Sequence, residues 1–395
     1  MTAAAGVAAR DPLGVWCGWL LVGAAILSPL LAWLSPLGFA PMVSLVGLLA
    51  LPTLRMEDED RPAAVALFAA LIWAAVSTTW SPFHAGHVIG STILKLAFQL
   101  PLYWSAVCAA RRADRRLAGW ALAIFAWGFT ALGLLLAIEA LTGGAIYRML
   151  NPIRWDLARK NLAHATFVLA LLWPLAALGA PVRLRPWLGL AMAASLGAAA
   201  SIMLADAPVM ALPLALLAGA AVYLWPRGGP RVFAGASVVL FLAMPAAIWA
   251  IRRSGDFVAL QAGLPLSWSE RLGYWSHALD WIAARPLKGW GLDASRMFGP
   301  GIQLHPHDGA LQIWMELGLV GAVSAAAFWG VTLLRLERPR RSLAAAATAA
   351  SLSAYLLFGA INFGVWQEWW LALGALVAML AALHVRAEAE ADLST

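Results

Sequence analysis

The sequence predicts an all-α polytopic membrane protein with about twelve transmembrane helices and one large outer loop before a late span. Hydrophobic residues make up 62% of the 395-residue chain and charged residues only 12%, whereas soluble domains carry about a quarter charged residues. The apolar residues fall in runs of roughly 17–25, the length needed to cross a bilayer. Backbone in lipid must satisfy its own hydrogen bonds, so each run is predicted to be a helix.

The helices follow in order from these runs. Leu13 to Leu34 has spanning length and lacks the short hydrophobic region and small-residue cleavage site of a signal peptide, so it is predicted to be an uncleaved first span. The predicted spans are 13–34, 36–54, 63–80, 88–109, 117–139, 161–180, 187–204, 208–225, 232–251, 309–334, 343–363 and 368–386. We therefore divide the chain into residues 1–251 with nine spans, an outer loop at 252–308, and residues 309–395 with three spans and a cytoplasmic C-terminus.

The distribution of arginines predicts the orientation of the chain in the membrane. Arginines gather in the loops on one side, at Arg10, 55–61, 111–116, 183–185, 227–231, 335–341 and Arg386. The short loops on the other side, at 35, 81–87, 205–207 and 364–367, contain neither lysine nor arginine. The positive-inside rule therefore places both termini in the cytoplasm.

Two outer loops break this distribution, 140–160 and 252–308. Their cations are Arg148, Arg154, Arg159, Lys160, Arg252, Arg253, Arg271, Arg285, Lys288 and Arg296. Binding of an anion would explain cations on the outer side. The alternative is that long loops translocate regardless of their charge. We favour an anion site because both loops depart from the rule.

The second of these loops contains a predicted amphipathic helix. Ser267 and Glu270 fit a capping box, with Ser267 as the N-cap, and Pro286 is expected to end the helix before a turn at 288–291. Its apolar stripe comprises Leu272, Trp275, Leu279 and Ile282, at helical spacing. A tryptophan-rich helix of this kind is expected at the outer membrane–water boundary, which would place Arg271 at headgroup depth.

Two histidines follow, directly before the tenth predicted span. Asp308 is a suitable N-cap for that span, and the positive end of the helix dipole favours a nearby anion and a neutral imidazole at His307. A neutral imidazole is the form that acts as a general base. Three interpretations stay open from the spacing alone: ordinary interfacial histidines, a metal site at His305 and His307, or a base beside a phosphate site. No carboxylate or third histidine stands at a zinc-like spacing.

A resemblance to a known family adds to this interpretation. The residues that carry it are Arg271-x-x-Tyr274-Trp275, Pro286-Leu287-x-Gly289-x-Gly291 and His305-x-His307-Asp308-x-x-Leu311-x-x-x-x-Glu316-x-Gly318. They resemble the O-antigen ligase/polymerase superfamily, bacterial inner-membrane glycosyltransferases with a GT-C-like helical fold and one large periplasmic loop. The motifs cover residues 271–321, and the predicted topology covers the whole chain.

The resemblance implies transfer of a glycan from undecaprenyl pyrophosphate to a hydroxyl group on the periplasmic side, by a metal-independent inverting mechanism without a cofactor. It assigns His307 as the base and Arg271 as the loop arginine that binds the pyrophosphate. Arg154 or Arg159 corresponds to the arginine that members place before the sixth span. We add His305, Lys95, Arg252 and Trp275 as substrate-binding candidates, Trp275 by stacking on a sugar ring.

Two departures from the family pattern affect the site. Asp308 stands where members usually have Asn, which adds a negative charge near the proposed pyrophosphate. Residues 206–208 stand where many relatives carry a Ser-Arg pair, so a phosphate cation is missing or is supplied by Arg252 or Arg253. Glu316 is costly in lipid if ionised and is expected to face the bundle interior, whereas Glu139 and Glu368 at span ends are expected to be solvated.

The expected partners are therefore membrane lipids, a lipid-linked glycan donor and a glycan or lipid acceptor, with no nucleic acid. The acceptor is lipid A core for a ligase, which we favour, another glycan repeat for a polymerase, or a protein hydroxyl. A transporter of lipid-linked sugar is the alternative from another class, but it would need ionisable groups near the bilayer midplane, where only Lys95 is a candidate. A scaffold for an envelope polysaccharide complex leaves the outer cations unexplained.

Overall fold

The computed structural model describes residues 11–388, so Arg10 and the last residues of the predicted C-terminus, 389–395, lie outside the described part. Within it every regular element is helical and no strand occurs. Ten helices of this part are long and apolar enough to cross a membrane. The predicted class, an all-α polytopic membrane protein, is confirmed.

The chain forms two compact units. Of the described residues, unit 1 comprises 11–55, 101–204 and 372–388, and unit 2 comprises 56–100 and 205–371. Helices α4 (Thr92–Arg112) and α15 (Glu368–Glu388) each contribute to both units. The predicted outer loop at 252–308 lies within unit 2, and the cationic loop at 140–160 lies within unit 1.

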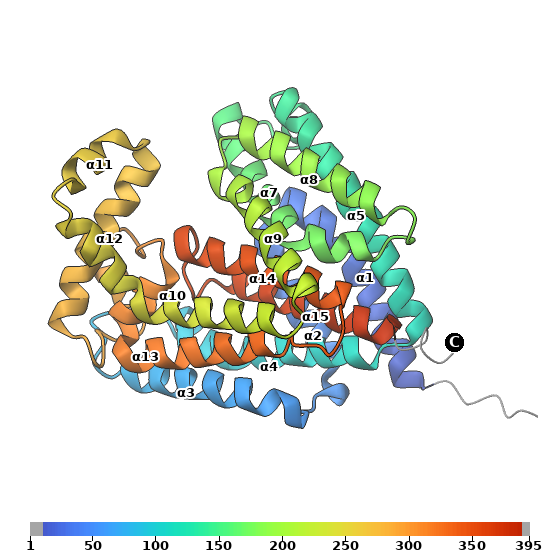
Figure 1. Ribbon diagram of the computed structural model, residues 1–395, viewed down its shortest axis with the longest axis horizontal. Coiled ribbons are helices and arrows are strands. Elements are labelled where there is room, and N and C mark those ends of the chain that lie inside the picture. The colour runs from blue at the N-terminus through green and yellow to red at the C-terminus, as the bar shows by residue number, and fades with distance from the viewer. Residues whose placement is uncertain (1–10, 389–395) are drawn as a thin grey trace, which may run out of the picture. The chain divides into compact units, whose positions relative to one another are not determined.

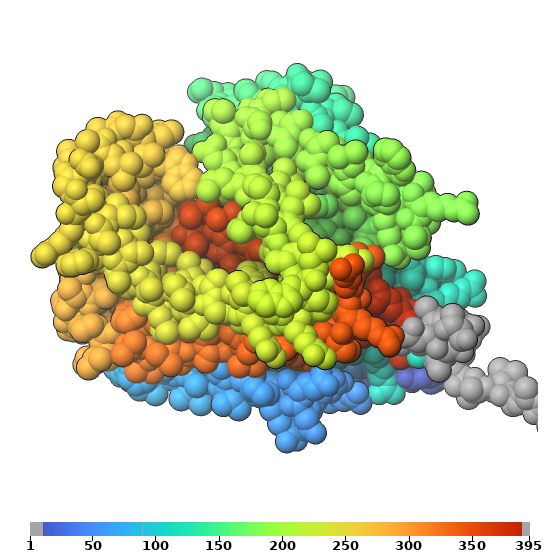
Figure 2. All heavy atoms as spheres, viewed as in Figure 1, coloured from blue at the N-terminus to red at the C-terminus, as the bar shows by residue number. Residues whose placement is uncertain are grey.

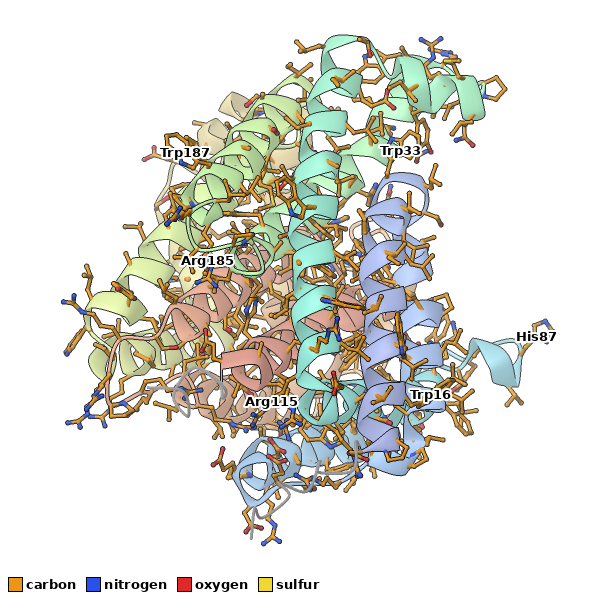
Figure 3. The ribbon with its side chains drawn as sticks, turned by 90° about the vertical axis from the view of Figure 1, so that its right-hand side faces the viewer. Trp16, Trp33, His87, Arg115, Arg185 and Trp187 are labelled. Atoms are coloured by element: carbon orange, nitrogen blue, oxygen red, sulfur yellow. The ribbon has the colours of Figure 1, made fainter. Side chains whose placement is uncertain are left out.

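Unit 1 is built around one long helix, α5 (Arg115–Leu141), which packs on three others. Figure 3 shows α5 standing beside α1 (Pro12–Leu34). The remaining elements are η1 (Pro36–Gly38), α2 (Phe39–Leu49), η2 (Leu51–Thr53), α6 (Ala145–Leu150), α7 (Trp155–Leu178) and α8 (Arg185–Ile202). Small residues allow these helices to approach closely: a Cβ at Gly179 would overlap the Leu122 carbonyl of α5.

Unit 2 is built around α13 (Gly309–Leu334), which lies between α10 (Gly228–Arg253) and α3 (Arg61–Ser77), as Figure 1 shows. Helix α9 (Asp206–Leu224) packs on α14 (Leu343–Ile361). The outer loop forms α11 (Phe257–Gly263), α12 (Leu266–Ala284) and η5 (Ala294–Met297), and Figure 2 shows α11 and α12 in yellow at the surface. Two short elements, η3 (Asp58–Asp60) and η4 (Val88–Gly90), precede α3 and α4.

Two of the twelve predicted spans differ from the other ten. The segment predicted at 36–54 forms only a short apolar helix, α2, and α8 is not among the ten spanning helices of the described part. The C-terminal end of α2 nevertheless lies near the first turns of α1. The Trp16 indole donates a hydrogen bond to the Leu49 carbonyl there, at 3.0 Å. The count of twelve stays a prediction.

Two local predictions are wrong. Ser267 is not an N-cap, because α12 begins at Leu266 after Pro265, whose fixed φ suits the approach to a helix start. Glu139 is fully buried rather than solvated: its carboxylate accepts the backbone N–H groups of Ile146 and Tyr147, at 3.2 and 2.7 Å. It thereby provides acceptors for backbone N–H groups at the start of α6, which have no partner within that helix. The apolar stripe of α12 is confirmed, since Leu272, Leu279 and Ile282 are buried.

Candidate functional site

A break inside α13 positions the site. Gly318 has φ +66° and ψ −159°, which interrupts the helix and releases backbone groups on either side of it. The turn at 286–291 and helix α3 satisfy these groups through the bonds Trp290 N–H to Met315 O (2.9 Å), Gly291 N–H to Glu316 O (2.7 Å), Trp73 indole N–H to Leu317 O (2.8 Å) and Leu319 N–H to Pro286 O (2.9 Å). Irregular backbone at membrane depth requires such pairing. The Pro-Leu-x-Gly-x-Gly motif at 286–291 and the Glu-x-Gly motif at 316–318 are therefore hydrogen-bonded to each other. We call this contact between the turn and the break in α13 the joint.

Glu316 stands at the centre of this joint and is fully buried. Its carboxylate accepts four hydrogen bonds, from the Trp366 indole (2.6 Å), the Ser295 hydroxyl (2.6 Å), the Gln312 amide (3.1 Å) and the Asp293 N–H (3.2 Å). The expectation that Glu316 faces the interior is confirmed. Since the donors come from η5 and its flank, from α13 and from the loop before α15, this side chain connects three segments.

Asp308 begins α13 as predicted. Its Oδ1 accepts the N–H of Leu311 at 2.9 Å, the geometry of an N-cap. Burial raises the pKa of this carboxyl to about 7, although hydrogen bonds from Leu311 and Ala310 oppose the shift. Near neutral pH the side chain is thus partly uncharged, which reduces the departure from the Asn of the family pattern.

His307 adopts left-handed backbone geometry, with φ +54°. Its Nδ1 lies 2.9 Å from the carbonyl oxygen of Asn362, at the end of α14. A carbonyl only accepts hydrogen bonds, so Nδ1 carries the proton and the neutral ring presents an unprotonated Nε2. Burial lowers the pKa of His307, the bond to Asn362 opposes this, and the charge of Arg271 lowers the pKa further. The ring also stacks against Tyr274 of α12, with centroids 6.0 Å apart.

His305 supports the backbone of His307. Its Nδ1 accepts the His307 N–H at 3.1 Å, and the two ring centroids lie 4.4 Å apart. Burial, together with the charges of His307 and Arg296, lowers the pKa of His305 to about 4. His305 is therefore neutral over the physiological range, with its proton on Nε2.

Arg271 lies on α12 and is half-buried. Its guanidinium stacks over the Trp268 ring at 5.0 Å, and the Trp268 indole donates to Asp206 at the start of α9, at 3.1 Å. Burial lowers the pKa of Arg271, while the charges of Asp206 and Glu270 raise it. Within the described residues no carboxylate lies within ion-pair distance of this guanidinium. A half-buried cation that has no carboxylate at ion-pair distance is a candidate binding group for an anion.

Two further candidates fasten α12 in place. Trp275 donates its indole N–H to the Pro306 carbonyl, between the histidines, at 3.0 Å. Arg252, at the end of α10, binds the Asp280 carboxylate at 2.7 Å and the Ser276 carbonyl at 3.1 Å. Both side chains thus hold α12 against α10 and the histidines; contact of either with a substrate stays a prediction.

The other predicted site residues lie elsewhere. Lys95 of α4 forms an ion pair with Glu368 at 2.6 Å, and Gln99 donates to the same carboxylate at 2.8 Å. Arg154 and Arg159 belong to unit 1, where Arg154 is 84% exposed and pairs with Asp156 at 3.1 Å. The structure therefore brings together the predicted residues of unit 2 around the histidines, and the approach of the loop at 140–160 stays a prediction.

Sequence reasoning overlooked several contributors to the site, among them the four donors around Glu316, the Asn362 carbonyl, Tyr274 as a partner of His307, and Asp206 as the anchor of Trp268. Tyr274 belongs to the quoted Arg-x-x-Tyr-Trp motif, so a signal for it existed. Asn362 acts through its backbone, which leaves no trace in the identity of the residue.

Fold and site together define a multi-pass membrane protein with a neutral histidine and a half-buried arginine at the start of a broken helix. Residues 190–326 match the family model described as O-antigen ligase, a stretch that includes α12, both histidines and Glu316 but not Trp73, Asn362 or Trp366. The resemblance to the O-antigen ligase superfamily is thereby confirmed.

Curated relatives agree over a similar length. Proteins named putative polysaccharide ligase, from Rickettsia conorii and Rickettsia prowazekii, are each 27% identical to the chain, over 138 and 132 residues. These matches cover 31% and 30% of this chain, and the chain spans about a third of the relatives' length, 34% and 33%. No solved structure matches the chain significantly.

Proposed function

We propose that the protein is a metal-independent, inverting glycosyltransferase of the bacterial inner membrane. It moves a glycan from undecaprenyl pyrophosphate to a hydroxyl acceptor at the periplasmic face, with lipid A core as the favoured acceptor. The observation that carries the proposal is the pairing of His307, with an unprotonated Nε2, and Arg271, a half-buried cation near it. The family match and the names of the relatives support the same class of reaction.

In the proposed reaction the acceptor hydroxyl lies against Nε2 of His307. The hydroxyl oxygen attacks the anomeric carbon while its proton passes to Nε2. The bond between that carbon and the phosphate oxygen breaks, and its electron pair leaves with the pyrophosphate. Attack from the face opposite the leaving group inverts the anomeric configuration.

Arg271 stabilises the charge that grows on the departing pyrophosphate. A guanidinium offers two parallel donors to phosphate oxygens and stays charged at all relevant pH values. Donors fixed before the reaction act strongly in a site with little water. Trp268 beneath the guanidinium and Asp206 beyond it hold the side chain in position. In this proposal Arg154 or Arg159 supplies a second phosphate contact.

After transfer, His307 must release its proton. The lowered pKa of the ring favours this release, because the buried imidazolium beside Arg271 is less stable than the neutral form. The hydrogen bond to Asn362 keeps Nδ1 protonated throughout, so the ring returns to the same tautomer.

The experiment is glycan transfer by the purified chain, with lipid-linked donor and separate acceptors. His307→Asn should lose about 10²–10⁴-fold in rate, the usual contribution of a positioned base. Asn tolerates the left-handed backbone at this position, so the variant removes the base and keeps the fold. His305→Ala should be milder. Near-wild-type transfer by His307→Asn would refute the proposal, and the acceptor that is glycosylated distinguishes ligase, polymerase and protein transferase.

A transporter of lipid-linked sugar would behave differently in this assay. It would move labelled donor across vesicle membranes without forming a new glycosidic bond. The transporter alternative would be favoured if the protein translocated the donor and formed no new glycosidic bond with any class of acceptor.

A further inference from the structure

Two adjoining hollows, of about 310 and 230 Å³, lie at one end of unit 1. They share Asp11, Arg112 and Arg386 among their lining residues. Two aspartates line the hollows, Asp11 and Asp114. Six arginines also line them, namely Arg55, Arg111, Arg112, Arg115, Arg116 and Arg386. These residues stand at or near the ends of α1, η2, α4, α5 and α15, so the hollows lie where the ends of several unit 1 elements meet.

Both aspartates are already committed to partners within the protein. Asp11 accepts two hydrogen bonds from the Arg112 guanidinium, at 3.0 and 3.3 Å, and also caps α1. Asp114 caps α5 by accepting the N–H groups of Arg116 and Leu117. Within the described residues no carboxylate lies at ion-pair distance from Arg115 or Arg116. Arg115 and Arg116 therefore bring positive charge to the larger hollow that no carboxylate of the described residues pairs with.

Tryptophans place the hollows at the depth of the lipid headgroups. Trp16, Trp19 and Trp120 of α1 and α5 are 47, 53 and 44% exposed. Arg116 stacks over Trp120 at 4.8 Å, and Arg111 stacks over Trp104 at 5.0 Å. Figure 3 shows Trp16 at the same end of α1 and α5 as Arg115, with Trp33 at the opposite end. Exposed tryptophans mark the membrane–water interface.

We propose that these hollows bind the phosphate group of an anionic phospholipid. The guanidinium groups of Arg115 and Arg116 line the larger hollow, and a guanidinium can offer two parallel hydrogen bonds to the oxygens of a phosphodiester. Basic pockets between transmembrane helices on the cytoplasmic side suit such headgroups, and the positive-inside rule predicts that side for these residues. A zwitterionic headgroup carries its own cation and gains less from the excess charge. Inorganic phosphate shares the chemistry and is the competing source.

The experiment uses the full chain, purified and reconstituted in phosphatidylcholine nanodiscs. Phosphatidylglycerol is titrated into one series and inorganic phosphate into another, and bound lipid is counted by native mass spectrometry with the unfolding temperature recorded in parallel. Phosphatidylglycerol should be retained and should raise the unfolding temperature, because a ligand of the folded state stabilises it. Inorganic phosphate at the same concentration should do neither.

Variants test the assignment of the site. The double variant Arg115→Gln/Arg116→Gln should bind phosphatidylglycerol about tenfold or more weakly, since it loses charge-assisted hydrogen bonds. Arg340→Gln/Arg341→Gln removes the same charge from exposed arginines outside the hollows and should bind as the wild type does. Arg115→Lys/Arg116→Lys keeps the charge, and its intermediate affinity would show that a loss in the glutamine variant is not caused by misfolding.

Three results would overturn the proposal. Equal retention of phosphatidylcholine would show that headgroup charge is not recognised. An equal loss in the Arg340/Arg341 control would show a general charge effect rather than a site. Stabilisation by inorganic phosphate alone, abolished in the Arg115/Arg116 variant, would assign the hollows to a soluble anion.

Discussion

Replacement of Glu316 by glutamine tests the joint that carries the histidines. In the wild type Oε1 accepts from Ser295 and Gln312, and Oε2 accepts from Trp366 and Asp293. A glutamine can keep its carbonyl oxygen toward the indole and the backbone N–H. Its NH₂ group then replaces Oε1, where the Ser295 hydroxyl can turn to accept but the Gln312 amide cannot without flipping.

The size of the effect follows from these contacts. A buried polar contact left unsatisfied costs about 1–3 kcal/mol. Hydrogen bonds to a charged acceptor contribute about 1.5–3 kcal/mol, against about 0.5–1.5 for a neutral one. The variant should therefore lose about 2–4 kcal/mol of stability. Transfer activity should fall with it, because η5, α13 and the loop before α15 lose their common anchor.

The exchange Gln312→Glu/Glu316→Gln provides the matched control. In the wild type the Gln312 carbonyl oxygen also accepts the Val365 N–H at 3.1 Å. The carboxylate introduced at position 312 would accept both this N–H and the amide introduced at position 316, so donor and acceptor again match. Unfolding in detergent, followed by tryptophan fluorescence, should show partial recovery in the double variant. An unchanged stability of Glu316→Gln, or no recovery on exchange, would refute the hydrogen-bond reasoning.

Three further predictions concern the site. Arg271→Lys should lose most transfer activity although it keeps the charge, because lysine lacks the planar pair of donors; full activity across donor concentrations would disprove a role for Arg271 at the pyrophosphate. Burial raises the pKa of Asp308 to about 7, so the stability it contributes is complete below about pH 4 and is lost as pH rises toward 7. Asp308→Asn should therefore unfold at a higher temperature than the wild type, by a margin that grows from about pH 4 to about pH 7; a constant margin would contradict the shift. Transfer should survive a strong chelator, because arginines supply the positive charge, and a loss with EDTA that Mg²⁺ restores would overturn the metal-independent mechanism.

Local and periodic features were predictable from the sequence. Apolar runs predicted the class of fold and twelve spans, ten of which correspond to helices of the described part that meet the criteria for spanning, because helix length must match the bilayer. The stripe on α12 predicted its buried face, since side chains three and four residues apart share one side of a helix. Asp308 was predictable as a cap because its partner lies only three residues away.

Partners distant in the sequence were not predictable, and these decide the site. Ser267 fitted a capping pattern, yet α12 begins two residues earlier than that pattern implies, with Pro265 at the N-cap position. Glu139 was expected in solvent, but it folds back onto the start of α6. Lys95 had no visible partner in the sequence, and it pairs with Glu368 near the other end of the chain.

What the sequence determined by itself was therefore the membrane class, the orientation of helix faces and the identity of the chemical groups. The tertiary structure alone decided the break at Gly318, the four donors around Glu316 and the tautomer of His307, which Asn362 fixes through its backbone carbonyl. The physical reason is that periodicity and capping depend on neighbours within a few residues. A buried carboxylate or imidazole instead takes its proton state from whichever donors and acceptors the closed chain places beside it.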